Sequence, residues 1–279
     1  MRAIVAHHLG EPEVLKIEES PAPSARKGEV VVAVHVAGVN FAETERRRGV
    51  YRPPSFPWIP GGEGAGVVAT VGPQVDPAWI GARVAFWALE PATSGSYAEL
   101  CRAPVDSLFP LPDSLDFETA AALPLQGLTA YGLVHFGAAI RAGQTVLVQA
   151  AGGGVGLLAV QLARLAGARV LGTASSESKR AAIARVGGEP FEYGDDLAER
   201  IRAATAGRGV DVVLDSVGRV TQTLSLDCLA PFGLLVHYGE ASGPAAPLEI
   251  DRLYDRSLRV SAYLVNSEHP AGAFDQARR

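Results

Sequence analysis

The sequence predicts an α/β protein made of a β-rich N-terminal domain and a C-terminal domain with a doubly wound parallel sheet. Two observations carry this prediction. In roughly the first 110 residues, short Val-rich segments are separated by Pro and Gly clusters, which is typical of a small barrel or sandwich. From Val146 onward, apolar strands alternate with segments of helical periodicity, which indicates a parallel sheet covered on both faces.

Each strand expected in the N-terminal part is an apolar run between turn residues. The expected strands are AIVAHH (3–8), LKIEE (15–19), EVVVAVHVAGV (29–39), GAGVVATVG (64–72) and ARVAFWAL (82–89). Clusters such as SPAPSARKG interrupt them, because Pro and Gly favour turns. A helix is expected to begin near Asp116, whose carboxylate can cap it, with Glu118 in its first turn.

The C-terminal part has a strand–helix rhythm. VLVQA (146–150), VGLLAVQLARLAG (155–167) and ARVLGTA (168–174) are expected as strand, helix and strand, from their apolar spacing. Further short buried strands are expected in VDVVLDSVG (210–218), GLLVHYG (233–239) and SLRVSAYLV (257–265). This succession predicts the doubly wound domain.

Composition excludes several classes of protein. The chain has 279 residues, a net charge of −5, and no basic stripe, which argues against a nucleic-acid partner. The run Arg46–Arg48 is short, and we expect it to be solvated surface. Cys101 and Cys228 lack partners at metal-binding spacing, which favours a reducing, cytoplasmic location. The N-terminal residues resemble neither a signal peptide nor an anchor, and no apolar run approaches membrane-spanning length, so we expect a soluble protein.

The stretch QAAGGGVG (149–156) lies at the first strand-to-helix turn of the C-terminal domain. Read from Ala151, it is A-x-G-x-x-G, with Gly153 and Gly156 at the second and third positions of a dinucleotide-binding fingerprint. Gly153 would let the backbone approach a pyrophosphate, and Gly156 would let helix and strand pack closely. The helix N-terminus would add free N–H groups and a partial positive charge. A flexible turn is the alternative, but the following helix and strand favour a phosphate site.

The end of the next strand predicts which dinucleotide binds. A carboxylate there usually holds the free 2′-hydroxyl of NAD, but this chain has Ala174 at that place. The donors Ser175, Ser176, Lys179 and Arg180 follow and suit the 2′-phosphate of NADPH. A charge-assisted contact of roughly 1.5–3 kcal/mol would favour NADPH by about ten- to a hundredfold. Alternatively, the two cations are solvated on the next helix, partly offset by Glu177.

Many ordered motifs resemble one known superfamily, the medium-chain dehydrogenase/reductases, and within it the zeta-crystallin-like quinone oxidoreductases. The matching motifs are AGVNFAETERRRGVY (37–51), IPGGEGAGVVATVG (59–72), LPLQGLTAYGLV (123–134), VQAAGGGVGLLAVQLAR (148–164), DSVG (215–218), SLDCL (225–229) and YGEASG (238–243). The resemblance implies a GroES-like catalytic domain over 1–122 and an NADPH-binding Rossmann domain over 123–265, with the active site between them. The first motif, residues 37–51, resembles the Asn-containing loop of the family and its Tyr, which are Asn40 and Tyr51 here.

The resemblance also implies the cofactor contacts. The pyrophosphate turn would consist of Gly152, Gly153, Gly154, Val155 and Gly156. The 2′-phosphate side would consist of Ser175, Ser176 and Lys179, and the adenosine side of Tyr193. The path towards the nicotinamide would consist of Ser216 to Gly218, His237, Tyr238, Gly239, Glu240 and Ser242, and the set is completed by Ala262, Tyr263 and Leu264. Asn40, Tyr51 and Thr129 would flank the nicotinamide and the acceptor, with Asn40 and Tyr51 as catalytic candidates. Thr129 could instead cap a helix turn, and Tyr51 could pack on the Pro-rich loop that follows it.

The residues at the zinc positions of the superfamily argue against a metal. Zinc-dependent members carry a Cys where this chain has GVN, and Gly-His-Glu where it has Gly61-Gly62-Glu63; Asn40 and Gly62 cannot replace those ligands. The structural zinc lobe needs four cysteines, and the chain has two. A site without zinc needs an acceptor that is already electrophilic, such as a quinone, to which Asn40 and Tyr51 could donate hydrogen bonds.

Two alternative functions remain open at this point. Conjugated enals, enones and enoyl thioesters are also electrophilic, so an NADPH-dependent enoyl or enone reductase fits the same residues. A crystallin-like protein that binds the cofactor without turnover is the second alternative. Preference among acceptors would discriminate the first alternative from a quinone reductase.

The C-terminal end differs from the resembled family. Its members usually continue for several tens of residues, and here 266–279 reads as the start of a return segment that appears cut short. A truncated chain, a frame-shift or a fold without those strands would each explain this. The segment 257–265 is expected to be the edge strand of the sheet, and by resemblance two such strands pair in a homodimer, which would also cover an apolar edge.

Overall fold

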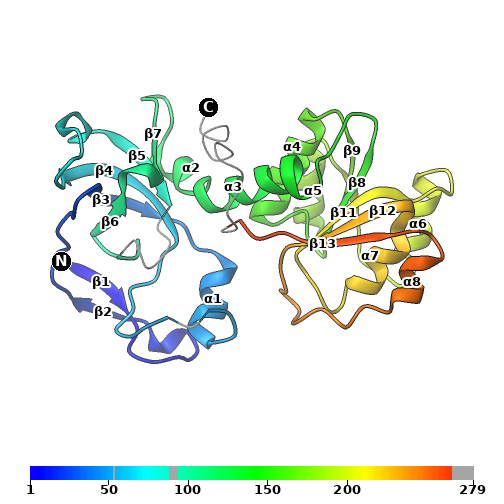
Figure 1. The fold of residues 1–279 in the computed structure, drawn as a ribbon, viewed down its shortest axis with the longest axis horizontal. Coiled ribbons are helices and arrows are strands. Elements are labelled where there is room, and N and C mark those ends of the chain that lie inside the picture. The colour runs from blue at the N-terminus through cyan, green and yellow to red at the C-terminus, as the bar shows by residue number, and fades with distance from the viewer. Residues whose placement is uncertain (53, 88–93, 266–279) are drawn as a thin grey trace. The chain divides into compact units, whose positions relative to one another are not determined.

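The computed structural model describes residues 1–52, 54–87 and 94–265. It divides into two compact units, Met1–Leu125 and the part from Gln126 onward; Figure 1 labels the elements of both. The expected strand residues 88 and 89 and the expected return segment 266–279 lie outside the described residues.

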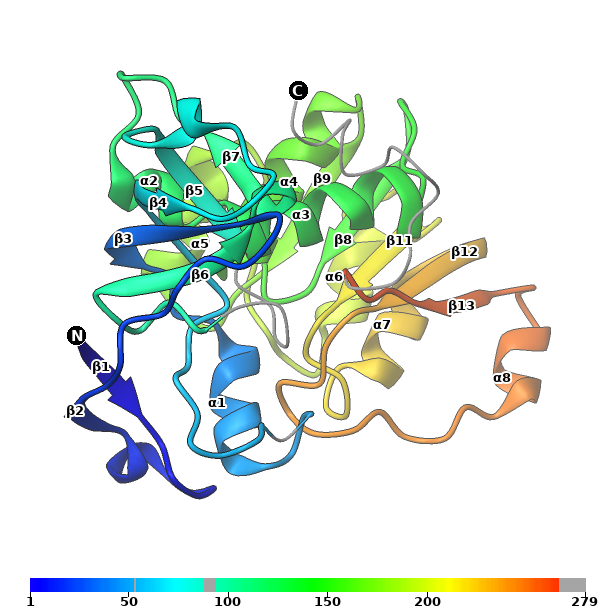
Figure 2. The ribbon, with the colours of Figure 1, turned by 60° about the vertical axis from the view of Figure 1, so that its left-hand side comes forward.

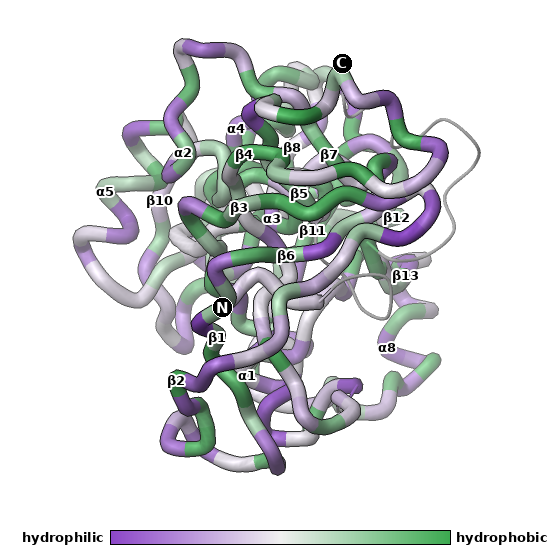
Figure 3. The backbone as a smooth tube through the Cα atoms, turned by 90° about the vertical axis from the view of Figure 1, so that its left-hand side faces the viewer, coloured by the Kyte–Doolittle hydropathy of each residue, from purple (hydrophilic) through white to green (hydrophobic). Residues whose placement is uncertain are grey.

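An antiparallel sheet forms the framework of the N-terminal unit, with strand order β6-β3-β4-β5-β7 (Figure 2). Its strands are β3 (Glu29–Ala37), β4 (Glu63–Val71), β5 (Arg83–Trp87), β6 (Leu100–Pro104) and β7 (Leu108–Pro110). A second, two-stranded sheet pairs β1 (Arg2–Val5) with β2 (Lys16–Glu19). Val30, Val32 and Phe86 are fully buried in one core cluster, because alternate strand residues share one face of the sheet. Figure 3 shows the apolar character of β3 and β5.

In the described part of the N-terminal unit, two α-helices and three 3₁₀ turns accompany the sheets. They are α1 (Phe41–Arg48), α2 (Phe117–Ala121), and the turns Pro12–Val14, Pro77–Trp79 and Val105–Ser107. The expected cap of α2 is confirmed, because the Asp116 carboxylate accepts from the N–H of Thr119 at 2.6 Å. The prediction of a loop over 37–51 is wrong for most of that range, because α1 occupies Phe41–Arg48. The prediction that Arg46–Arg48 is solvated surface is wrong for Arg47, which is 8% exposed and donates to the Gly10 carbonyl at 3.0 Å.

The C-terminal unit contains a six-stranded parallel sheet with strand order β10-β9-β8-β11-β12-β13, which confirms the doubly wound prediction. The strands are β8 (Thr145–Val148), β9 (Arg169–Thr173), β10 (Glu189–Phe191), β11 (Val210–Asp215), β12 (Leu229–His237) and β13 (Arg259–Ala262). The chain proceeds outward from β8 to β10 in one direction and from β11 to β13 in the other. The order therefore reverses between β8 and β11, where such sheets bind ligands. β13 is the edge strand, as expected for 257–265.

Helices cover both faces of this sheet. They are α3 (Pro124–Gly132), continued by a π-helical turn Leu133–Gly137, α4 (Gly154–Leu165), α5 (Glu177–Arg185), α6 (Leu197–Ala204), α7 (Gln222–Cys228) and α8 (Ile250–Tyr254). Val146 and Val148 of β8 pack in a cluster with α4, whereas Leu147 between them packs in a second cluster with α6 and α7. This alternation shows that β8 contributes to two cores, which is why it is apolar on both faces. Within the described ranges, no helix combines the length and the apolar character needed to cross a membrane.

Candidate functional site

The turn after β8 brings the predicted pyrophosphate residues together at the start of α4. Ala150 adopts a φ of 50°, and the N–H of Ala151 donates to the Thr173 carbonyl of β9 at 2.8 Å. Gly153 is the N-cap residue of α4 and has extended backbone angles. The backbone therefore crosses from strand to helix over one short turn, and the first N–H groups of α4 are available to an anion.

The glycines of this turn are required for different reasons. A Cβ on Gly156 would lie 2.6 Å from the Cα of Ala151, so helix and turn pack closely there, as the fingerprint predicts. A Cβ on Gly152 would lie 2.6 Å from the Cβ of Lys179. A Cβ on Gly154 would overlap the side-chain amide of Gln126. The Cβ of Gly153 would meet only the Ala150 carbonyl oxygen, at 3.3 Å, so Gly153 is the least crowded of these four glycines.

The predicted 2′-phosphate residues lie next to this turn. Ser176 caps α5, because its hydroxyl accepts from the N–H of Lys179 at 3.4 Å. Lys179 packs on Gly152 and has no ion-pair partner within the described part of the chain. Arg180, in contrast, donates to the Ala174 carbonyl at 3.3 Å and forms an ion pair with Glu192 at 3.2 Å. Lys179 is therefore the cation that is open to an added anion.

Tyr193 directs its hydroxyl to the turn itself. Its oxygen accepts from the N–H of Ala150 at 3.0 Å and lies 2.9 Å from the hydroxyl of Thr173. Burial raises the pKa of Tyr193. The hydroxyl thus supports the backbone of the turn, and the structure places this adenosine-side candidate beside the pyrophosphate candidates.

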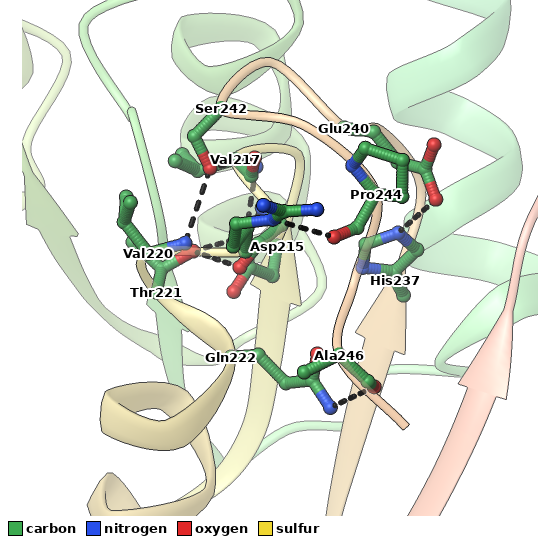
Figure 4. A network of polar contacts seen from close by, with 12 residues as sticks. Asp215, Val217, Val220, Thr221, Gln222, His237, Glu240, Ser242, Pro244 and Ala246 are labelled. Atoms are coloured by element: carbon green, nitrogen blue, oxygen red, sulfur yellow. Dashed lines mark hydrogen bonds and ion pairs between the residues drawn. The ribbon is translucent and has the colours of Figure 1, made fainter. Parts of the chain in front are cut away.

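Two loops hold the predicted residues of the nicotinamide side together (Figure 4). The Ser242 hydroxyl donates to the Val217 carbonyl at 2.8 Å and accepts from the N–H of Val220 at 3.1 Å. Gly218 has a φ of 89°, and its Cβ would lie 2.8 Å from the Gly243 carbonyl. The loop after β11 therefore packs closely on the loop after β12.

The second of these loops also carries His237, Tyr238, Gly239 and Glu240. His237 Nε2 lies 3.7 Å from the Glu240 carboxylate, and a Cβ on Gly239 would lie 2.9 Å from the Ser216 carbonyl. Burial raises the pKa of Tyr238 to about 12, so this phenol is neutral at physiological pH. The structure thus brings Ser216, Gly218 and the candidates of 237–242 into one assembly.

Tyr263 faces α3. Its N–H donates to the His237 carbonyl at 2.9 Å, which keeps Ala262 and Leu264 beside the end of β12. Its ring lies where Cβ atoms on Gly132 and Gly137 would fall. Thr129 lies on the same helix and is half-buried. The side chain of Tyr263 therefore packs in the core cluster of the sheet and helix α4.

Asn40 forms hydrogen bonds with two buried carboxylates, those of Glu43 and Glu63, in the N-terminal unit. The side-chain amide of Asn40 donates to Glu63 at 2.7 Å, and its backbone N–H donates to Glu43 at 2.9 Å. Glu43 also accepts from the N–H of Gly62 and from the Tyr97 hydroxyl at 2.9 Å. Burial raises the pKa of both carboxyl groups, and burial raises that of Tyr97 as well.

Tyr51 lies at the opposite end of α1 from Asn40. Asn40 is the N-cap residue of α1, whereas Tyr51 follows the helix, and its N–H approaches the Glu45 carbonyl at 3.3 Å. An eight-residue helix is about 12 Å long. The Arg52 guanidinium lies 5.4 Å from the Tyr51 ring centroid. The N-terminal unit alone therefore does not bring the two catalytic candidates to one point.

Several residues of these sites were not predicted from the sequence: Glu43, Tyr97, Gln126, Gln149 and Asp215. Only Glu43 has a local signal, because an acidic residue three positions after an Asn is the pattern of a helix N-terminus. The positions compared above with zinc ligands have other roles, since Asn40 caps α1 and Gly62 donates to Glu43. Among the described residues, no group of three His, Cys, Asp or Glu side chains is arranged to hold a metal ion.

Comparison with known proteins matches both units to family models. Residues 26–113 match the alcohol dehydrogenase GroES-like domain, and residues 154–277 match the family described as zinc-binding dehydrogenase. The name of the second family does not by itself assign zinc to this chain.

Individual relatives match almost the full length of the chain. A quinone oxidoreductase of Pseudomonas aeruginosa is 42% identical, over 90% of this chain and 78% of the relative. A 2-haloacrylate reductase of a Burkholderia species is 38% identical, over 94% of this chain and 79% of the relative. The crystal structure of Escherichia coli quinone oxidoreductase complexed with NADPH has a TM-score of 0.91 and 35% identity, and the match covers 99% of this chain and 85% of that one.

Proposed function

The chain belongs to the family of these quinone oxidoreductases, among the medium-chain dehydrogenase/reductases, and from that premise we propose that it transfers hydride from NADPH to a quinone. One observation from this chain carries the cofactor part of the proposal. Gly153 is the least crowded glycine of the turn at the N-terminus of α4, and Lys179 packs on the neighbouring Gly152. A dinucleotide with an additional phosphate needs these two features together.

The protein's own residues bind and orient in this proposal. The first N–H groups of α4 stabilise the pyrophosphate, and Lys179 stabilises the 2′-phosphate with Ser175 and Ser176. The loop residues Ser216 to Gly218 and 237–242 support the nicotinamide side. NADPH supplies the hydride when it is bound. Asn40 offers an amide hydrogen to the developing negative charge on the acceptor oxygen, as an oxyanion donor does.

A second class of acceptor is supported by one comparison. The related 2-haloacrylate reductase is named for an activated alkene, which is a conjugated acceptor. Reduction of an enone or an acrylate by this chain is therefore the alternative proposal. The third proposal is a crystallin-like role, in which the protein binds the cofactor without turnover.

The decisive experiment measures oxidation of NADPH by its nicotinamide absorbance, with a simple quinone, with an acrylate or with neither. Quinone-dependent oxidation well above the protein-free rate, with NADPH preferred over NADH, is the expected result. Oxidation with the acrylate alone would instead support the second class. Binding of NADPH without oxidation by either acceptor would support the role without turnover.

A homodimer and a cytoplasmic location also remain proposals. β13 lies at the edge of the six-stranded sheet, and a second copy pairing there would extend the sheet and satisfy its free backbone groups. Light scattering tests this, with a monomeric mass as the contradicting result. Substitution of the edge residue Val260 by proline should shift the mass from dimer to monomer, because proline removes a ladder donor.

A further inference from the structure

We propose that Gln149 is a positioning residue that couples the pyrophosphate turn to the nicotinamide-side loop through a buried, directional chain of hydrogen bonds. The inference rests on the proposed binding of NADPH. Gln149 follows β8, and its partners Ser225 and Asp215 belong to α7 and β11. The chain therefore crosses the place where the strand order reverses, beneath the expected cofactor.

On the turn side, the chain begins at the backbone of Ala150. Its N–H donates to Tyr193 at 3.0 Å and to Thr173 at 3.1 Å. The Thr173 hydroxyl lies 2.7 Å from the side-chain oxygen of Gln149, which can only accept, so Thr173 donates its one hydrogen there. Tyr193, 2.9 Å from Thr173, must then donate to the Thr173 oxygen.

On the loop side, the chain ends at Asp215. The side-chain nitrogen of Gln149 donates to the Ser225 hydroxyl at 3.1 Å, and Ser225 donates to Asp215 Oδ2 at 2.7 Å. The other oxygen, Oδ1, accepts from the N–H groups of Val217 and Gly218 at 2.8 and 3.2 Å. The Thr221 hydroxyl also donates to Oδ1, at 2.9 Å (Figure 4). Asp215 therefore fixes the loop that holds Ser216.

The side-chain amide of Gln149 matches both of its partners in this chain of hydrogen bonds. Gln149, Thr173 and Ser225 are each 0% exposed, so water does not replace a lost partner. Gln149 presents an acceptor to Thr173 and a donor to Ser225 at once. Leucine would remove both, and glutamate would place a second acceptor beside Ser225, whose one hydrogen already serves Asp215. A buried polar group without a hydrogen-bond partner destabilises the protein, because nothing replaces the hydrogen bonds that it made to water.

This arrangement fixes the distance between two parts of the proposed site without contact between Gln149 and the cofactor. The Ala150 backbone belongs to the pyrophosphate turn, and the Val217 and Gly218 backbone belongs to the nicotinamide-side loop. A ligand that uses both parts benefits from their fixed spacing, whereas a ligand that uses only the turn does not. This difference separates a positioning role from a purely structural one.

The experiment compares Kd values of NADPH and adenosine 2′,5′-bisphosphate, which lacks the nicotinamide half. The variants are Gln149→Leu and Ser225→Ala, with Gln161→Ala on the exposed side of α4 as the matched control. We expect the ratio of the two Kd values, bisphosphate over NADPH, to fall about tenfold in both variants, the size expected for one lost buried hydrogen bond. The control should leave the ratio unchanged.

The outcomes separate this proposal from the proposed function. An unchanged ratio in folded Gln149→Leu would overturn the coupling, even if both ligands bind more weakly, because equal weakening indicates a general defect. If Gln149→Leu does not fold, Ser225→Ala decides, since it removes only the loop-side link. Failure of the unmodified protein to bind NADPH would contradict the proposed function instead.

Discussion

The side-chain amide of Asn40 donates to the Glu63 carboxylate across 2.7 Å, inside the N-terminal unit. Glu63 reaches this position because its other oxygen accepts from the Leu125 N–H at 2.7 Å, and Gly38 leaves room where a Cβ would overlap the carboxylate. One of the two amide hydrogens of Asn40 is therefore used within the protein. This contact fixes the orientation of the Asn40 amide relative to Glu63.

The stability of the protein should depend on pH through Glu63. Burial raises its pKa, with a further contribution from the Glu43 charge, so the folded chain binds its proton more tightly than the unfolded chain does. The Glu63 carboxyl has a pKa of about 4.3 in the unfolded chain and a higher pKa in the folded chain. Between these two pKa values, the free energy of unfolding contributed by Glu63 falls as pH rises, by up to ~1.4 kcal/mol per pH unit. Urea unfolding from pH 4 to 8 should show this fall in the difference between wild type and Glu63→Gln. The exposed Glu118→Gln serves as control, and a difference independent of pH would contradict the prediction.

Lys179 should determine the preference for NADPH over NADH. Lys179→Ala removes the cation beside Gly152 and should weaken NADPH binding by about ten- to a hundredfold, the effect of losing a charge-assisted contact. Binding of NADH should change little, because it lacks the 2′-phosphate. Titration of both cofactors measures the ratio. The neighbouring Arg180→Ala is the control, since its side chain is already paired with Glu192; an equal loss of preference in both variants would argue against a specific role for Lys179.

Gly153 and Gly154 should respond differently to the same substitution. Gly154→Ala forces the added Cβ against the Gln126 amide and should lower the melting temperature of the free protein. Gly154→Ala combined with Gln126→Ala should recover most of that loss, because the overlapping atoms are removed. Gly153→Ala should lower the melting temperature less than Gly154→Ala does, because its Cβ meets only the Ala150 carbonyl oxygen, and it should weaken NADPH binding. Thermal unfolding and cofactor titration of the three variants test this. No loss in Gly154→Ala alone would mean that Gln126 moves aside, and failure of the double variant to recover would mean that the loss does not come from Gln126.

Local patterns in the sequence predicted the elements whose stability is local. The Asp116 cap and the close approach at Gly156 follow from short-range chemistry, and the strand within 257–265 follows from its apolar run. Helix α1 was missed because its sequence FAETERRR is polar, and its buried Glu43 and Arg47 are held by distant backbone groups. β10 contains Pro190, which weakens the signal of a strand, yet an edge position tolerates it.

The site was predicted less completely than the fold, because its supporting contacts join distant parts of the sequence. The glycine turn and Lys179 are close in sequence and carry a known spacing. Gln149 and Ser225 are separated by 76 residues, and Asn40 and Glu63 by 23, so no local pattern pairs them. Gln149 offers one indirect signal, which is a polar residue at the end of an otherwise apolar strand.

The packing of Tyr263 on Gly132 supplies a final prediction. A Cβ on Gly132 would overlap the Tyr263 hydroxyl oxygen, so Gly132→Ala must displace the ring or the helix. Overpacking of this kind costs about 1–3 kcal/mol, and urea unfolding should show that loss. In a Tyr263→Leu background the same substitution should cost much less, because the overlapping atoms are absent. Equal costs in the two backgrounds would mean that Gly132 is required for another reason. A cost confined to the tyrosine background would identify core packing as the role of the Tyr263 ring, and a cofactor contact would then come from the backbone near Ala262 and Leu264.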